Sequence, residues 1–317
     1  MLKITGMLLS TFLLLPITSF ASPEDNYPES LLYSQPKKVA KNVWTSIGAT
    51  QYYSYENGGH NNNLSFVIGT DSILVVNGGS SYLLAKALHD EIKKISALPV
   101  KYVVDENGQS HAILGNGYWK EQGAKIIAHV DALEEVSEQG LEGLENLQTI
   151  LKERAEGTEL IAVDETFTDQ LTLDLGGLKV ELIHFGPAHS VGDISVFVPA
   201  NNVLIAGDMA FQQRLLPIFP DTDTAEWLET WNNAFAPFAE DKIIIPGHGD
   251  VTDFKTVDQW TRGYLAYIRA KVAELLENDG SLEDAYLIDQ SPYAHLETFD
   301  QLAAKNAGRV FEAMEFE

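Results

Sequence analysis

One segment near the first third of the chain constrains the fold most, because it joins a buried strand to a helix through a polar loop. Residues 102–104 are Tyr-Val-Val, an aromatic and β-branched run that favours a buried strand. Polar residues 105–110 follow, and a helix is expected to begin near His111. In α/β proteins such loops aim side chains into a crevice. The segment therefore predicts a layered α/β fold whose chemistry lies at this loop.

Strand-like and helix-like patterns alternate along the rest of the chain. This alternation predicts a βαβ-type layered protein, α/β in class or α+β by some schemes. Strands are expected at residues 43–45, 51–53, 65–68, 73–76, 102–104, 124–128, 171–175, 180–183, 194–198, 203–205 and 242–245. Helices are expected at residues 80–96, 112–122, 130–155, 225–235, 254–278, 282–287 and 299–314.

Composition limits both the chemistry and the partners. The sequence contains no cysteine, which excludes disulfides, thiolate metal sites and cysteine nucleophiles. Any metal must therefore be held by histidine, aspartate and glutamate. The formal net charge of -25 argues against nucleic acid and anionic membranes, which need clustered basic residues. We expect a small-molecule substrate or ligand, no nucleic acid, and no membrane contact once the N-terminal segment is removed.

The N-terminal residues 1–21 have the pattern of a secretory signal peptide. Lys3 gives a positive start, an apolar run follows, and small residues at 19 and 21 suit cleavage after Ala21. An uncleaved membrane anchor is the alternative, but the run is short for a span and contains Pro16. We therefore expect a periplasmic or secreted protein.

Three later segments also place polar residues directly after apolar strands. His189 lies in the sequence Phe-Gly-Pro-Ala-His-Ser-Val-Gly-Asp, Asp208 ends Leu-Ile-Ala-Gly-Asp, and His248 lies in Ile-Pro-Gly-His-Gly. Because each follows a strand, all three side chains can converge at one end of the sheets. Imidazole nitrogen and carboxylate oxygen suit Zn²⁺ and related divalent ions.

Together with the first loop, these segments resemble the metallo-β-lactamase superfamily over roughly residues 43–275. The loop at residues 106–111 resembles the family's His-x-His-x-Asp-His motif, most closely that of the periplasmic quinoprotein relay system zinc metallohydrolases. The resemblance implies a four-layer αββα sandwich. Residues 43–317 would form a single metallo-β-lactamase-like domain with C-terminal helices, preceded by an irregular, proline-interrupted arm at residues 22–42.

The first loop departs from the family motif at three of its four positions. Glu106 stands at the first histidine, Gly108 at the second and Ser110 at the aspartate, whereas His111 keeps the last histidine. In addition, Asn77 stands where the family has an aspartate that braces the loop. Both decay of the site and a selected change of chemistry are compatible with these substitutions.

The resemblance implies a metal site made of His111, His189, Asp208 and His248, with Glu106 as a replacement ligand. His111, Asp208 and His248 with one open position would make a catalytic zinc arrangement. We therefore expect one zinc ion rather than two, or none, and these three residues are the expected catalytic residues.

Two functions follow from this interpretation. The first is an exported hydrolase in which metal-activated water attacks an ester, a lactam or a related bond, with weakened or altered activity. The second is a catalytically inactive superfamily member that binds a periplasmic ligand or partner. His60 lies in a loop that would border the site, either as a polar loop residue or as a ligand or substrate contact. The other histidines and two tryptophans have structural expectations. His184 is expected as a core residue within a strand, His89, His129 and His295 at the surface or at helix ends, and Trp227 and Trp231 in the core.

Overall fold

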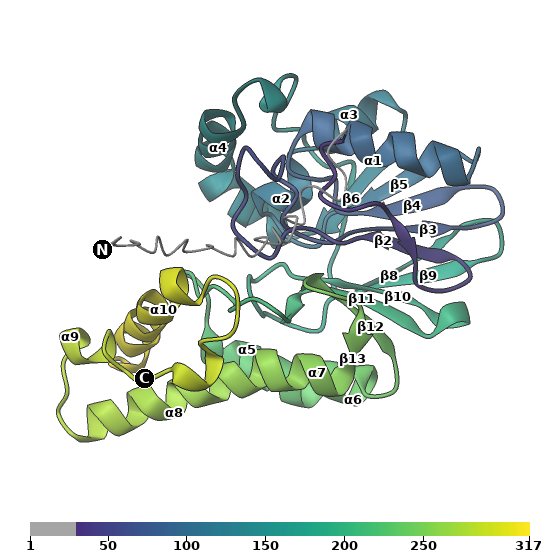
Figure 1. Ribbon diagram of the computed structural model, residues 1–317. Coiled ribbons are helices and arrows are strands. Elements are labelled where there is room, and N and C mark those ends of the chain that lie inside the picture. The colour runs from purple at the N-terminus through teal and green to yellow at the C-terminus, as the bar shows by residue number, and fades with distance from the viewer. Residues whose placement is uncertain (1–29) are drawn as a thin grey trace, which may run out of the picture.

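Two β-sheets stacked face to face form the centre of the protein, and helices cover the outer side of each sheet (Figure 1). The computed structural model describes residues 30–317. One sheet has seven strands and the other has six. The predicted four-layer αββα sandwich is therefore confirmed. The expected signal peptide at residues 1–21 lies outside the described residues, and export stays a prediction.

The seven-stranded sheet combines antiparallel and parallel pairing. Across the sheet its strands are β1 (Lys37–Lys38), β2 (Val43–Ser46), β3 (Leu64–Ile68), β4 (Ile73–Val76), β5 (Val100–Val104), β6 (Lys125–His129) and β7 (Glu165–Phe167). Strands β4 to β7 pair in parallel. Parallel neighbours need crossover connections, which contain α1 (Tyr82–Ile95), α2 (Ser110–Ile113), α3 (Asn116–Glu121), α4 (Ala132–Leu151) and the 3₁₀ turn η2 (Lys152–Ala155). The carboxyl ends of β4, β5 and β6 consequently share one edge of the sheet.

The six-stranded sheet carries the second half of the chain. Across the sheet its strands are β13 (Thr252–Asp253), β12 (Ile243–His248), β11 (Val203–Phe211), β10 (Ser195–Val198), β9 (Lys179–Ile183) and β8 (Gln170–Asp174). Only β11 and β12 pair in parallel here. The helical segments of this half are η3 (Pro199–Asn201), α5 (Thr224–Thr230), η4 (Trp231–Phe235), α6 (Ala236–Ala239), α7 (Phe254–Val257), η5 (Asp258–Arg262), α8 (Gly263–Glu277), α9 (Leu282–Ala285), η6 (Ser291–Tyr293) and α10 (Phe299–Met314).

Helix α1 shows how the sequence sets these elements. The Ser81 side chain accepts a hydrogen bond from the Leu84 N–H at 3.1 Å and so caps the first turn. Leu84, Leu88 and Ile92 recur at helical spacing and are buried against the seven-stranded sheet. Among residues 30–317, no helix combines the length and the apolar character needed to cross a membrane.

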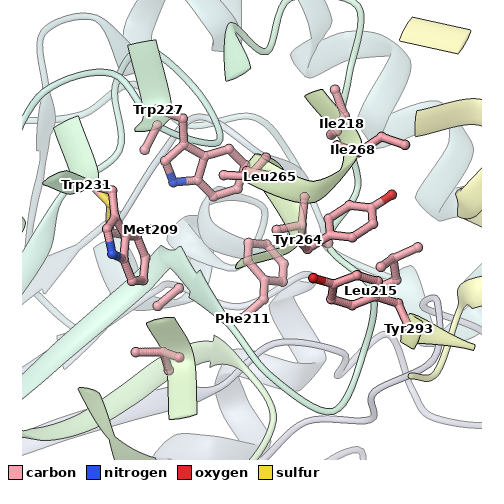
Figure 2. Packing of buried hydrophobic residues seen from close by; sticks show 14 of the residues in the cluster. Met209, Phe211, Leu215, Ile218, Trp227, Trp231, Tyr264, Leu265, Ile268 and Tyr293 are labelled. Carbon is pink, nitrogen blue, oxygen red and sulfur yellow. The ribbon is translucent and has the colours of Figure 1, made fainter. Parts of the chain in front are cut away.

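The largest apolar cluster lies between the six-stranded sheet and the helices of the C-terminal part. Figure 2 shows Trp227, Trp231 and Tyr264 gathered around Met209 and Phe211 of β11. Trp227 and Trp231 are fully buried, so their predicted place in the core is confirmed. All nine residues of β11 are buried, because helices cover one face of the strand and the other sheet covers the opposite face.

Some expected elements differ from those observed. Residues 51–53, expected as a strand, form a loop whose Tyr52 and Tyr53 line a cavity. Tyr53 is half-buried and Tyr52 is 39% exposed, so their aromatic character reflects the lining of the cavity and not strand pairing. Within the expected irregular arm, residues 37–38 pair with β2 as the edge strand β1. The edge strands β1, β7 and β13 have only two or three residues each, which is too short for a periodic pattern to predict.

The expectations for two histidines were wrong. His89 and His129 were predicted at the surface or at helix ends, and both are buried. His89 Nδ1 lies 2.8 Å from the Tyr118 hydroxyl, and its ring packs on Trp119. His129 Nε2 lies 2.5 Å from the Thr168 carbonyl oxygen. In both cases the partner comes from a different element, which local sequence patterns do not specify.

Helix α10 holds the loop that follows β11. Asn306 is fully buried, and its amide donates to the Leu216 carbonyl at 2.8 Å and to the Tyr264 hydroxyl at 3.0 Å. Its side-chain oxygen accepts the Ile218 N–H at 3.0 Å. One amide therefore satisfies three buried polar groups and attaches the C-terminal helix to this loop.

We expect Asn306→Leu to lower the free energy of unfolding by about 2–6 kcal/mol, because two buried backbone groups lose their partners at about 1–3 kcal/mol each. Lys305→Leu, at the neighbouring exposed position, is the matched control and should change stability by about 0.5 kcal/mol or less. Urea denaturation measures both variants. Equal stability of the two variants would contradict the role assigned to Asn306.

Candidate functional site

The five residues predicted as metal ligands come together at one end of the sandwich. Glu106 follows β5, His111 lies in α2, His189 follows β9, Asp208 lies within β11, and His248 ends β12. The parallel pairing of β4 to β6 and of β11 with β12 brings these strand ends to the same edge. All five side chains are buried or nearly so.

The Asp208 carboxylate lies at the centre of this group. His111 Nε2 is 3.5 Å and His189 Nε2 3.9 Å from Asp208 Oδ2, and His248 Nε2 is 3.3 Å from Asp208 Oδ1. Glu106 Oε1 lies 3.2 Å from His111 Nε2. Ligand bonds of about 2.0–2.2 Å place neighbouring ligands of a tetrahedral zinc ion roughly 3.3 Å apart. Glu106, His111 and Asp208 offer three ligand atoms within 4.8 Å of one another.

Burial sets the protonation of the group. It raises the pKa of Glu106 to about 7 and the pKa of Asp208 to about 7, because an anion in this site loses its hydration. Burial also lowers the pKa of His189 to about 3, and it depresses the pKa of His111 and His248. The three imidazoles are thus neutral at pH 7 and have a free lone pair, as metal coordination requires.

Hydrogen bonding fixes the tautomer of His248. Its Nδ1 lies 2.5 Å from the Asn61 carbonyl oxygen, so Nδ1 carries the proton and donates it to that carbonyl. The lone pair of Nε2 then faces Asp208. A histidine that donates its second nitrogen to a backbone carbonyl is the usual arrangement of a metal ligand. The ring also stacks on Phe211 with a centroid distance of 5.1 Å.

The loop at residues 106–111 is braced from below by Asn77. The Asn77 side-chain oxygen accepts the Glu106 N–H at 3.0 Å, and the Asn77 backbone has a positive φ of 69°. Asn107 donates to the Asp193 carboxylate at 3.1 Å, and the same carboxylate accepts the Ser190 N–H at 2.6 Å. The support expected from the family's aspartate is therefore still present with asparagine in its place.

A second brace, which sequence reasoning missed, connects the two halves of the chain. The Asn63 amide donates to the carbonyl groups of Pro246 at 2.8 Å and Gly249 at 2.7 Å, on either side of His248. The Asn63 N–H donates to the Gly247 carbonyl at 2.7 Å. The only sequence signal for this brace is the asparagine-rich stretch at residues 56–63, whose composition is typical of a turn.

A cavity of about 570 Å³ opens above the group. Residues of helix α4 line it, together with Tyr52, Tyr53, Pro217 and Phe219. Arg214 is the one lysine or arginine among the described residues that line the cavity, and it is only 2% exposed. From the sequence, Arg214 follows Asp208 in a loop that could line a pocket, but nothing fixes its role. The helix predicted at residues 130–155 is present, but its place at the cavity, like that of the two tyrosines, was not predicted.

The other histidines lie away from this cavity. His60 is fully buried, and its Nδ1 accepts the Tyr33 N–H at 2.9 Å. His184 directly follows β9 and is not within it; its Nδ1 lies 2.9 Å from the Asp193 carbonyl, and its ring stacks on His129. His129 Nδ1 already accepts the Asp131 N–H at 3.2 Å, so this pair serves packing.

Comparison with known proteins agrees with the geometry. The sequence model of the metallo-beta-lactamase superfamily matches residues 58–248, well over half of the chain. The protein belongs to the metallo-β-lactamase superfamily. The match ends at His248, so the last helices lie beyond it.

The metallo-beta-lactamase type 2 of Bacteroides fragilis is 22% identical over 234 residues, covering 71% of this chain and 86% of that protein. The Bacillus cereus protein of the same description is 27% identical over 222 residues, covering 68% and 77%.

Solved structures show the same superfamily fold. A metallo-beta-lactamase from Pontibacter korlensis superposes with a TM-score of 0.59 at 17% identity and covers 73% of this chain and 98% of its own. A double mutant of a sec-alkyl sulfatase superposes with a TM-score of 0.68 at 14% identity over 89% of this chain and 50% of its own. At these identities the likeness concerns the fold.

We expect loss of the hydrogen bond between Asn77 and the Glu106 N–H to lower the free energy of unfolding. Asn77→Gly keeps the positive φ but leaves the buried Glu106 N–H unpaired, which costs about 1–3 kcal/mol. Asn77→Ala should cost about 1 kcal/mol more, because alanine is strained at this φ. Chemical denaturation of the zinc-free protein tests both. Wild-type stability of Asn77→Gly would show that the loop does not depend on this hydrogen bond.

Proposed function

We propose that the protein is an exported hydrolase with a single-metal site, acting on an ester, lactam or related bond of a small anionic substrate. The observation that carries the proposal is the ring of three neutral imidazoles around the buried Asp208 carboxylate. Burying an aspartate away from water lowers the free energy of unfolding. Stability alone therefore does not explain why this group is present.

The donor set fits one divalent ion. Asp208 is 1% exposed, and its Oδ1 has no hydrogen-bond partner. Glu106, His111 and Asp208, whose ligand atoms lie within 4.8 Å of one another, would hold zinc. His248, whose Nε2 lies 3.3 Å from Asp208 Oδ1, would complete the set as the fourth ligand, with His189 beside it. A zinc ion there would supply Lewis-acid polarisation and an activated water at neutral pH.

The other residues of the cavity would bind and orient the substrate. Arg214 lies next to His248, and its buried Nε has no hydrogen-bond partner. Its guanidinium carbon lies 5.5 Å from the centroid of the Tyr52 ring. An anionic group of a substrate would pair with this cation, which is otherwise poorly compensated, and apolar parts would pack on Tyr53 and Phe219.

A specific contact favours the alternative function. Glu106 Oε1 lies 3.2 Å from His111 Nε2, within hydrogen-bonding distance. With a proton on Nε2, this pair would be satisfied without a metal, and the protein would then be an inactive relative that binds a small ligand in the same cavity. Zinc content separates the two proposals.

We expect the purified mature protein to retain about one equivalent of zinc after dialysis, measured by elemental analysis. His248→Ala should lose it, because one of four ligands is removed. His295→Ala, which removes an exposed histidine, is the control and should retain zinc. Absence of zinc from the wild-type protein at micromolar zinc would exclude the hydrolase and leave the binding protein.

Arg214 is expected to set substrate preference. Arg214→Met should lower kcat/KM for the carboxylate-bearing lactam nitrocefin about 10–100-fold, since a hydrogen bond to a charged group contributes about 1.5–3 kcal/mol. Hydrolysis of the neutral ester p-nitrophenyl acetate should change less than about threefold, which controls for damage to the site. Equal losses on both substrates would contradict recognition of an anion by Arg214.

A further inference from the structure

Helix α4 packs directly onto the loop that carries the ligands. A Cβ atom at Gly108 would lie 2.6 Å from the Ala132 carbonyl oxygen, 2.8 Å from Glu135 Oε2 and 2.9 Å from Glu135 Cβ. A Cβ at Gly192 would lie 2.4 Å from the Ala132 nitrogen. Backbone atoms cannot move aside by a side-chain rotation. The first turn of α4 can therefore occupy this position only while residue 108 is glycine.

The same helix reaches a second altered position of the loop. A Cβ at Gly143 would lie 2.3 Å from Ser110 Oγ, so α4 passes over Ser110 as closely as it does over Gly108. Two of the three departures from the family motif thus coincide with contacts to α4. The third, Glu106, packs over β11, where a Cβ at Gly207 would lie 2.2 Å from Glu106 Oε2. The altered loop fits its surroundings closely, which argues against simple decay.

Glu135 makes the polar contact between the helix and the loop. Its Oε2 accepts the Gly108 N–H at 2.8 Å, and the side chain is 7% exposed and lines the cavity. The loop between Glu106 and His111 is therefore held from two sides, by Asn77 below and by Glu135 from α4. An imidazole at residue 108 would need the space that Glu135 and the first turn of α4 now fill.

We propose that Glu135 is a positioning residue that replaces the missing second histidine of the loop, holding the loop in the shape that binds one metal ion. The inference rests on the proposed function, because it concerns the same metal. Because α4 packs against residue 108, no side chain can stand there to bind a second ion. The Glu135 hydrogen bond fixes the backbone between Glu106 and His111. Loss of a group that orients ligands typically lowers metal affinity about 10–100-fold.

The test measures zinc affinity of the full-length mature protein by competition with a chromophoric chelator. Glu135→Leu removes the acceptor and should weaken zinc binding about 10–100-fold. Glu135→Gln keeps an oxygen that can accept the Gly108 N–H and should stay within about threefold of wild type, as should Glu138→Leu at an exposed position of the same helix. Wild-type affinity of Glu135→Leu, or an equal loss in Glu135→Gln, would overturn the proposal. A wild-type protein without zinc would instead refute the proposed function.

A second measurement tests the packing without relying on zinc affinity. Gly108→Ala should lower the melting temperature of the zinc-free protein by about 3–10 °C, because its Cβ meets the backbone of α4. Gly117→Ala, where a Cβ has no contact closer than 3.5 Å, is the control and should not lower it. Gly108→His should be destabilised further and bind no second zinc equivalent. Two equivalents bound by Gly108→His at wild-type stability would overturn the proposal.

Discussion

The burial of the Asp208 carboxylate is the constraint on which the site depends. Asp208 lies within β11, a strand whose nine residues are all buried between two layers of the sandwich. A carboxylate in this place needs compensation, because charge loses its hydration there. Arg214 and His111 favour the charged form of Asp208, whereas His189 and His248 approach the carboxylate as neutral imidazoles. The surrounding loops must hold these groups in place.

Two additions around this centre give the cavity its shape. Helix α4 covers the loop at residues 106–111 through the contacts at Gly108 and Ser110. On the opposite side, α10 holds residues 216–218 through Asn306. The loop that carries Arg214 also pairs with the segment around Glu297, where the Leu215 N–H donates to the Glu297 carbonyl at 2.8 Å. Both walls of the cavity thus depend on helices that contribute none of the histidines.

Much of the fold could be predicted from the sequence because its signals are local. Strands β3 to β6 and β9 to β11 are apolar runs bounded by turn residues, and α1 shows helical periodicity with a serine cap. The ligand candidates each follow such a strand, so their convergence could be expected. Tyr52 and Tyr53 could not be placed, because an aromatic pair that lines a cavity and one in a strand have the same local pattern. His89 and His129 were misplaced for the related reason that their partners are distant in sequence.

The sequence by itself determined the layered class, which follows from periodicity, and the superfamily resemblance, which follows from short motifs at strand ends. The resemblance in turn implied that Glu106, His111, His189 and His248 lie near Asp208. It also showed that Gly108, Ser110 and Asn77 depart from the family pattern. Only the tertiary structure decided what those departures do. Asn77 still braces the loop, and Gly108 makes room for a helix that begins 24 residues later in the chain. Steric fit between distant segments depends on their docking in space, which no local pattern encodes.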